Sequence, residues 1–184
     1  MNITYINHSG FLVETDSCYI LFDYFNGELP EFEDKPIYIF SSHGHQDHFN
    51  RELFNRFDDD KVKYVLSGDI KKKVKTIDNA NILFVYPRKE YDYDMLHIKT
   101  LKSTDLGVAY IVEVDGARIY HGGDLNCWMW QEENKQYNNN MKNNYEREIN
   151  SIKDEVFDVA FVPLDPRQDI YYNMGIKYFL KQCV

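Results

Sequence analysis

The chain has 184 residues, of which 43% are hydrophobic and 16% aromatic, enough for one domain with a substantial core. Its 30 acidic and 21 basic residues give a formal net charge of −9, which would repel a phosphate backbone and argues against nucleic acid as a partner. The three cysteines lack the spacing of a zinc knuckle or a disulfide scaffold, and the sequence shows neither a signal segment nor an apolar run of about 20 residues. We therefore expect a cytoplasmic protein that has no contact with a membrane.

The first third of the chain predicts three short strands followed by a strand buried on both faces. Apolar runs separated by turn formers indicate an antiparallel meander at residues 3–6, 11–14 and 19–23. A continuous apolar run at residues 37–40 is typical of a buried strand. Apolar residues at helical spacing follow over 49–57, and residues 62–66 return to a strand pattern.

The rest of the chain predicts more strands, one polar excursion and a final helix. Strands are indicated at 81–85, 96–101, 108–114 and 118–121, with Asp115-Gly116 as a hairpin turn. Residues 132–152 are polar and rich in Asn, so we expect an exposed, partly helical segment outside the core, either a lid or a solvated excursion. A strand at 157–164 and a helix from 174–180 to the C-terminus complete a single α/β domain over 1–184.

The strongest chemical signal is a histidine cluster directly after the buried strand at 37–40. His43, His45 and His48 fall within six positions, and Asp47 lies among them. Neutral imidazole and carboxylate ligate zinc, manganese or iron, and a loop at a strand end can turn several ligands toward one point. We predict one or two divalent ions, zinc first, with His43 and His45 sharing one ion and Asp47 and His48 serving a second. The alternative is a histidine-rich surface loop without metal.

The spacing H-x-H-x-D-H after an apolar strand resembles the signature of the metallo-β-lactamase superfamily. Two further segments carry the resemblance, Asn-His-Ser-Gly-Phe at 7–11 and His-Gly-Gly-Asp at 121–124, and residues 103–107 and 123–126 resemble small bacterial hydrolases similar to L-ascorbate-6-phosphate lactonase. The resemblance implies an αββα sandwich with the site at one sheet edge. It also implies that Asp124 bridges the two metals, the alternative being a turn residue that caps a strand. Gly122 and Gly123 would let the backbone approach the ions closely.

Two positions depart from the family pattern. Ser103 stands nearest the place of the family's third histidine, although Asp105 could supply an oxygen ligand instead. The family's last histidine would follow a further strand, and the sequence stops at Val184. We therefore expect a C-terminally incomplete fold that binds metal weakly and exposes apolar surface, which favours self-association as a homo-oligomer.

Other candidates lie outside the histidine cluster. By the resemblance His8 lines the substrate pocket, with a turn residue as the alternative. As a strand residue His121 is expected to pack or to support a metal ligand, and direct metal ligation is the alternative. Asp165 and Arg167 follow the strand at 157–164, where Arg167 could hold an anionic substrate group or form an ordinary surface ion pair.

The main hypothesis is a metal-dependent hydrolase that acts on a small anionic ester, lactone or phosphoester. Metal-activated water would attack the substrate, and Asp47 would orient that water or bind the second ion. The rival hypothesis is a degenerate or truncated member of the superfamily that binds metal weakly and catalyses nothing.

Overall fold

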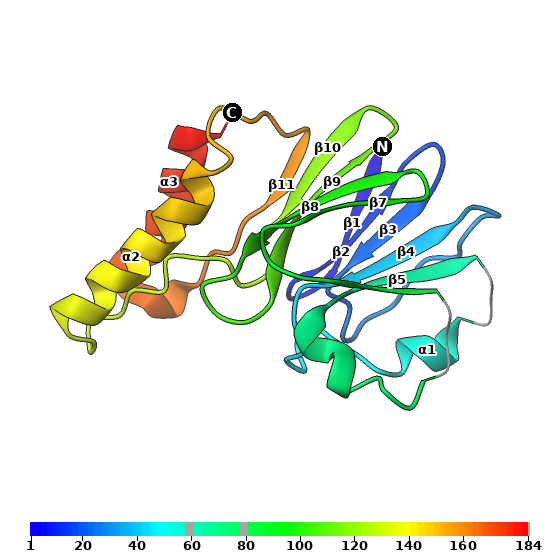
Figure 1. Ribbon diagram of the computed structural model, residues 1–184, viewed down its shortest axis with the longest axis horizontal. Helices are drawn as coiled ribbons and strands as arrows, with labels where there is room; N and C mark the ends of the chain where they lie inside the picture. The colour runs from blue at the N-terminus through cyan, green and yellow to red at the C-terminus, as the bar shows by residue number, and fades with distance from the viewer. Residues whose placement is uncertain (58–60, 78–80, 184) are drawn as a thin grey trace. The chain divides into compact units, whose positions relative to one another are not determined.

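The computed structural model describes residues 1–57, 61–77 and 81–183, which form two compact units. The units are Met1–Tyr86 and Pro87–Val184, and Val184 itself lies outside the described residues. Each unit contains one β-sheet and its own helices, so the mixed α/β class expected from the sequence is confirmed (Figure 1). The single domain expected over 1–184 depends on how the two units assemble and stays a prediction.

The first unit is built on a six-stranded sheet in the order β1-β2-β3-β4-β5-β6. Strands β1 to β3 pair antiparallel, which confirms the meander, whereas β3 to β6 pair in parallel. The carboxyl ends of parallel strands leave a sheet at the same edge, so the segments that follow β3, β4 and β5 lie along one edge. The elements are β1 (Asn2–Asn7), β2 (Gly10–Glu14), β3 (Tyr19–Phe22), β4 (Ile37–Ser41), α1 (Leu53–Arg56), β5 (Val62–Ser67), the 3-10 helix η1 (Gly68–Lys72) and β6 (Ile82–Val85).

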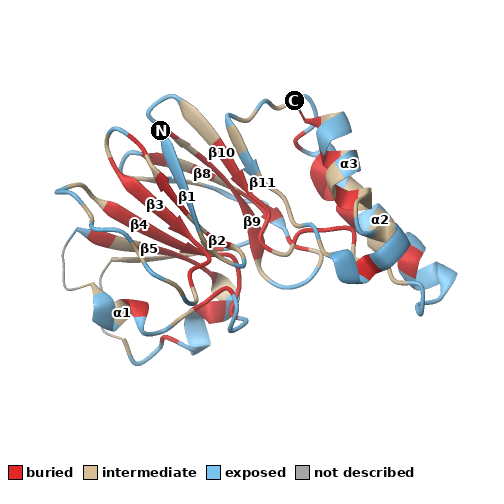
Figure 2. Cartoon of the chain, turned by 180° about the vertical axis from the view of Figure 1, so that it is seen from behind, coloured by how far each residue is buried: buried red, intermediate tan, exposed pale blue. Residues whose placement is uncertain are grey.

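The core of the first unit packs its sheet against α1 and η1. Leu53 of α1 and Ile70 of η1 join Ile39 and Leu66 of the central strands in one buried cluster. Every residue of β4 is buried, as the continuous apolar run predicted (Figure 2). The segment after β4 therefore starts from a rigid, desolvated strand end.

The second unit is built on a five-stranded sheet in the order β11-β10-β9-β8-β7. All its pairs are antiparallel except β10 with β11. Asp115 and Gly116 both have positive φ, 52° and 75°, which confirms the predicted hairpin between β9 and β10. The elements are β7 (Glu90–Tyr93), β8 (Leu96–Lys102), β9 (Val108–Val114), β10 (Ala117–His121), α2 (Lys135–Asn150), β11 (Val159–Phe161), the 3-10 helix η2 (Pro166–Tyr171) and α3 (Met174–Gln182).

The polar segment at 132–152 differs from its prediction because it contains a regular helix that contributes to the core. Helix α2 runs for 16 residues, and Tyr145 and Ile149, spaced by four, are buried against β9, β10 and α3. Tyr145 also donates a hydrogen bond to the carbonyl of Gly175 in α3. Sequence reasoning missed this face because the many Asn residues mask a narrow apolar stripe at helical spacing.

Two other elements are shorter than predicted. The helical spacing over 49–57 yields only α1, because the chain turns first and the side chain of Asn50 accepts from the amide of Glu52 before the helix begins. The strand expected at 157–164 reduces to β11, since Pro163 has no N–H with which to continue the ladder. The predicted strands at 81–85 and 96–101 are present within a residue of their limits, whereas β7 was not predicted.

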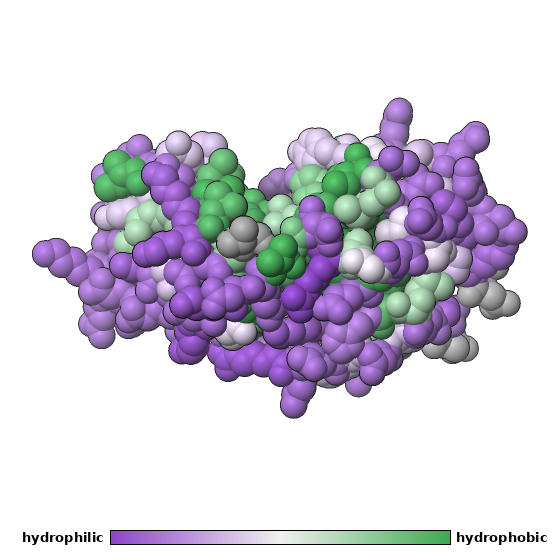
Figure 3. Space-filling model, turned by 90° about the horizontal axis from the view of Figure 1, so that it is seen from above, coloured by the Kyte–Doolittle hydropathy of each residue, from purple (hydrophilic) through white to green (hydrophobic). Residues whose placement is uncertain are grey.

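Figure 3 shows one face on which hydrophilic residues predominate and apolar residues form small patches. Among the described residues, no helix has the length and apolar character needed to cross a membrane.

Candidate metal centre

The histidine loop leaves β4 and folds back within the first unit. Ser42, His43 and His48 are buried at its two ends, whereas His45 and Asp47 are exposed at its tip. The amide of His48 donates to the carbonyl of His45 at 3.1 Å, which closes a tight turn. The loop therefore holds two imidazoles in the protein interior and presents one imidazole and one carboxylate to solvent.

Asp23 anchors this loop, and sequence reasoning did not identify it. Asp23 follows β3 and is fully buried; its carboxylate accepts from the amide of Ser42 at 2.6 Å, from the hydroxyl of Ser42 at 2.6 Å and from Nδ1 of His48 at 2.8 Å. Parallel pairing of β3 with β4 places the two strand ends together, and the amide of Asp23 bonds to the carbonyl of Phe40. The available signal was an acidic residue directly after a wholly apolar strand.

The Asp23 contacts also set the tautomers of two histidines. A carboxylate only accepts, so His48 carries its proton on Nδ1 and Nε2 has the lone pair. Ser42 gives its single hydroxyl proton to Asp23, so its oxygen accepts from Nδ1 of His43, 3.0 Å away. Both His43 and His48 are thereby prepared to bind a metal through Nε2, the arrangement that carboxylate partners produce behind metal-ligating histidines.

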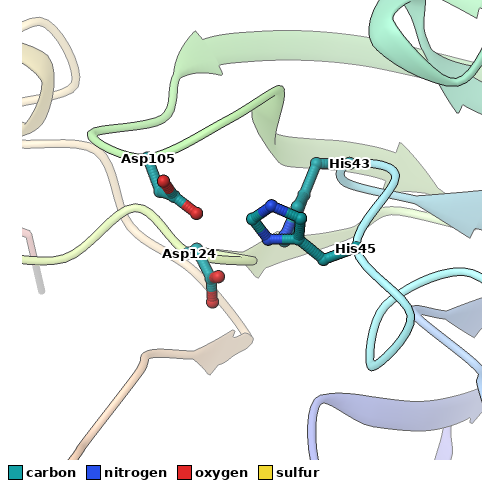
Figure 4. Close-up of side chains that lie close together, drawn as sticks. All are labelled: His43, His45, Asp105 and Asp124. Atoms are coloured by element: carbon teal, nitrogen blue, oxygen red, sulfur yellow. The ribbon is translucent and has the colours of Figure 1, made fainter.

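His43 and His45 form the first pair of candidate ligands. Nε2 of His43 lies 2.9 Å from Nδ1 of His45, and the ring centroids are 4.5 Å apart. Figure 4 shows the two imidazoles side by side on the loop after β4. In a tetrahedral zinc site with bonds of about 2.05 Å, ligand atoms are separated by about 3.3 Å, so a small opening of this pair would admit an ion.

The backbone at Gly44 is held between two side chains. Its amide donates to Oδ2 of Asp69 at 2.8 Å, and its carbonyl accepts from Nζ of Lys73. Asp69 lies in η1, and Lys73 directly follows this helix. The segment after β5 therefore binds the backbone of the loop after β4 through two hydrogen bonds. These two contacts fix the peptide between His43 and His45.

His8, Asp47 and His48 form a second group in the same unit. Each offers one ligand atom, and these atoms all lie within 4.8 Å of one another. Nε2 of His8 is 3.2 Å from Oδ2 of Asp47, and Nε2 of His48 is 3.9 Å from the same oxygen. The sequence assigned His8 to substrate binding, whereas the structure places it beside two predicted metal ligands.

Asp105 and Asp124 lie together in the second unit, and their carboxylates offer oxygens within 4.8 Å of one another. Asp105 belongs to the loop between β8 and β9, and Asp124 to the loop after β10 (Figure 4). Thr104 joins the two loops, because its hydroxyl donates to the carbonyl of Asn126 at 2.6 Å and accepts from the amide of Asn126 at 3.1 Å. Ser103 is buried and its hydroxyl accepts from the amide of Asp105, so it has a local structural role.

The residues before Asp124 form a close-packed turn. A Cβ on Gly122 would lie 2.8 Å from Cδ of Pro163, and Gly123 has φ 50°. His121 is buried, and its Nδ1 accepts from the amide of Gly123 at 3.2 Å. The close approach that requires Gly122 is thus to Pro163, and His121 supports the Asp124 turn.

Asp165 and Arg167 form a local ion pair at the start of η2. Nε of Arg167 lies 2.9 Å from both oxygens of Asp165, and the Arg167 side chain is 81% exposed. Asp165 also accepts from the amide of Arg167, as residues that begin a helix commonly do.

Several solved structures resemble this chain in fold. Igni18, described as a novel metallo hydrolase of Ignicoccus hospitalis, has a TM-score of 0.63 and 19% identity over 98% of this chain and 76% of that chain. A Parabacteroides distasonis protein assigned as a metal-dependent hydrolase has a TM-score of 0.64 and 18% identity over 89% of this chain and 69% of that chain. CmlA, a diiron beta-hydroxylase of Streptomyces venezuelae, has a TM-score of 0.51 and 12% identity over 69% of this chain and 30% of that chain.

These structural similarities are at low identity and establish the fold alone. No curated protein matches the chain significantly. Residues 2–140, most of the chain, match the family model described as the beta-lactamase superfamily domain. The resemblance drawn from the histidine loop is therefore confirmed, and the chain belongs to the metallo-β-lactamase superfamily.

Proposed function

We propose that this protein is a hydrolase that uses one or two divalent metal ions, zinc first, to cleave a small anionic ester, lactone or phosphoester. The observation that carries the proposal is the Asp23 network, which gives the buried imidazoles of His43 and His48 the tautomers that metal binding requires. A histidine-rich surface loop without metal would have no need of a fully buried carboxylate behind it.

A bound divalent ion supplies two things, a water whose pKa falls to about 7 and a Lewis acid that polarises the attacked carbonyl or phosphoryl group. The residues of the loop then divide the work. His43 and His45 would hold the ion, and Asp23 fixes the His43 ring through the hydroxyl of Ser42. The exposed carboxylate of Asp47 would either orient the attacking water or bind a second ion.

Asp105 and Asp124, the pair of carboxylates in the second unit, are proposed as further metal ligands. Family membership and the donor chemistry support this assignment, because paired carboxylates suit zinc, manganese or iron. Asp105 would replace the imidazole that the family pattern expects near Ser103.

The anionic character of the substrate is supported by Lys73, which lies beside the histidine loop and belongs to a lysine-rich stretch of the sequence. Lys71, Lys72, Lys73 and Lys75 follow one another closely in a chain whose net charge is −9, and Lys73 contacts the loop carbonyl of Gly44. Basic side chains at a site attract anions and raise their local concentration. Asp165 and Arg167 remain proposed substrate contacts, and the exposure of Arg167 supports that role.

The alternative is a superfamily member that binds a ligand or a metal without catalysis. The observation that favours it is Ser103, which supplies a buried hydroxyl where the family pattern expects an imidazole. A hydroxyl is a weak metal ligand beside imidazole or carboxylate, so the site would lose affinity unless Asp105 replaces it.

The test is hydrolysis by the purified protein, after metal removal and reloading with Zn²⁺ or Mn²⁺. The substrate panel contains 4-nitrophenyl acetate, a γ-lactone, 4-nitrophenyl phosphate and bis(4-nitrophenyl) phosphate, so that ester, lactone and phosphoester cleavage are separated. We expect one class to be cleaved, with activity lost in the chelator-treated protein and in His45→Ala. His97→Ala is the matched control, because His97 is a partly exposed histidine on β8 paired with Asp92.

The outcomes distinguish a metal-dependent hydrolase from a superfamily member without catalysis. Turnover that survives both chelation and His45→Ala would contradict the proposal, because it would arise elsewhere or from a contaminant. Tight metal binding without turnover of any class would favour the non-catalytic alternative.

A further inference from the structure

We propose that His8 is a metal ligand, and that with Asp47 and His48 it binds a divalent cation distinct from the one held by His43 and His45. The inference rests on the proposed metal centre and deepens it. It supplies an imidazole from the turn between β1 and β2, more than 30 positions before the histidine loop. No spacing in the sequence indicates this ligand.

The distances within the group suit one small cation. Ligand atoms around tetrahedral zinc are separated by about 3.3 Å, given bonds of 2.0–2.1 Å. The observed separations from Oδ2 of Asp47 are 3.2 Å to Nε2 of His8 and 3.9 Å to Nε2 of His48. The ligand atoms of the two imidazoles lie within 4.8 Å of each other. Side-chain rotation at the exposed His8 and Asp47 can bring the three atoms to the spacing of a zinc site.

The group combines one rigid ligand with two adjustable ones. His48 is 1% exposed and held through Nδ1 by Asp23, so its Nε2 is oriented before any ion arrives. His8 packs edge-on against His48 and Phe25, with ring centroids 5.6 Å and 6.0 Å apart. The side chains of His8 and Asp47 are 50% and 51% exposed, so a water or substrate can reach the fourth position. Two imidazoles, one carboxylate and one open position are the ligand set of catalytic zinc sites.

The backbone at His8 gives an independent reason to assign it a function. His8 is the first residue of the two-residue turn between Asn7 and Gly10, and its φ is 52°. This left-handed conformation costs a residue other than glycine about 1–2 kcal/mol, and glycine is the residue favoured at such hairpin positions. Strained positions of this kind concentrate at functional sites. A histidine at this position lowers the stability of the turn, but it places an imidazole next to Asp47.

The competing explanation is a surface ion pair between His8 and Asp47. Such a pair between half-exposed side chains contributes little to stability. The two explanations differ in their response to substitution, because only a metal ligand should alter cation stoichiometry.

The experiment measures Zn²⁺ and Co²⁺ binding to the metal-free protein by calorimetry, by elemental analysis after gel filtration and by the visible spectrum of bound Co²⁺. His8→Gly removes the imidazole and relieves the turn, and His8→Asp restores a carboxylate ligand in a residue type that tolerates positive φ. His97→Gly would weaken β8, so His97→Asp is the matched control for the loss of a partly exposed imidazole.

We expect two ions in the wild type, and in His8→Gly either one ion or a weaker site whose Kd rises at least about 10-fold. His8→Asp should recover part of the affinity and His97→Asp should equal the wild type. The midpoint of metal-free thermal unfolding of His8→Gly should equal or exceed that of the wild type, which excludes misfolding as the cause.

If His8→Gly still binds two ions with the affinity of the wild type, the inference is overturned and the proposed function stands. One ion in the wild type, unchanged by His8→Gly, would overturn the inference alone. No ion bound by the wild type would overturn both.

Discussion

Replacing Asp23 by asparagine tests whether a buried carboxylate sets the metal-binding nitrogens of His43 and His48. The substitution preserves size, and asparagine tolerates the φ of 43° that Asp23 adopts. One side-chain oxygen can still accept from the amide of Ser42. The new NH₂ group, however, faces two donors whose protons Asp23 accepts in the wild type, the hydroxyl of Ser42 and Nδ1 of His48.

The conflict changes the tautomer of His48. An imidazole that accepts from the introduced side-chain amide must carry its proton on Nε2, so the nitrogen beside Asp47 loses its lone pair. Loss of a partner behind a metal-ligating histidine weakens metal binding about 10–100-fold, equivalent to about 1.4–2.7 kcal/mol. The folded state should lose about 1–3 kcal/mol as well, because charged, buried hydrogen bonds are replaced by weaker ones.

Competition with a chromogenic chelator gives the Zn²⁺ affinity, and urea unfolding of the metal-free protein gives the free energy of unfolding. Asp158→Asn is the control, because Asp158 is exposed and belongs to the second unit. Its carboxylate accepts a hydrogen bond from the amide of Arg118, near the start of β10. Wild-type Zn²⁺ affinity in Asp23→Asn would refute the assignment of the tautomers.

Lys73, the buried cysteines and Glu148 each provide a further test. Lys73→Met removes the donor that braces the histidine loop and should weaken Zn²⁺ binding about 5-fold, from about 1 kcal/mol for one hydrogen bond, as chelator competition would measure. Burial raises the thiol pKa of Cys127 and Cys183 to about 11, so neither should react with a thiol reagent at pH 7 until the chain unfolds; stoichiometric labelling of the native protein would contradict this. Glu148→Gln removes a buried carboxylate that bonds to an arginine and a backbone amide, and it should lower the free energy of unfolding by about 1–3 kcal/mol in urea titrations.

The position of Glu148 shows why the second unit depends on contacts that no local pattern reveals. Its carboxylate accepts hydrogen bonds from the guanidinium of Arg88 at 2.5 Å and from the amide of Lys102 at 3.0 Å. These residues are 60 and 46 positions away in the sequence. The sequence around Glu148 predicted a solvated segment, because charged and Asn residues dominate its composition. The buried side of α2 is apparent only from the packing of the helix against β8 and β9.

Sequence alone determined the elements whose patterns are local. The apolar run before Ser41 required a buried strand, Asp115-Gly116 required a hairpin, and three histidines within six positions marked the loop that belongs to the superfamily. Each of these signals lies within a few residues, and hydrophobic periodicity and turn chemistry act over that range.

Tertiary structure decided which residues support the histidine loop. Asp23, Asp69 and His8 reach it from strand ends and turns that are distant in the sequence, through the parallel pairing of β3, β4 and β5 and the hairpin of β1 with β2. Strand order and register bring such residues together, and neither leaves a periodic signal in the sequence. The types of ligand residue were therefore predictable from the sequence, whereas the tautomers of the histidines and their hydrogen-bond partners depended on the folded sheet.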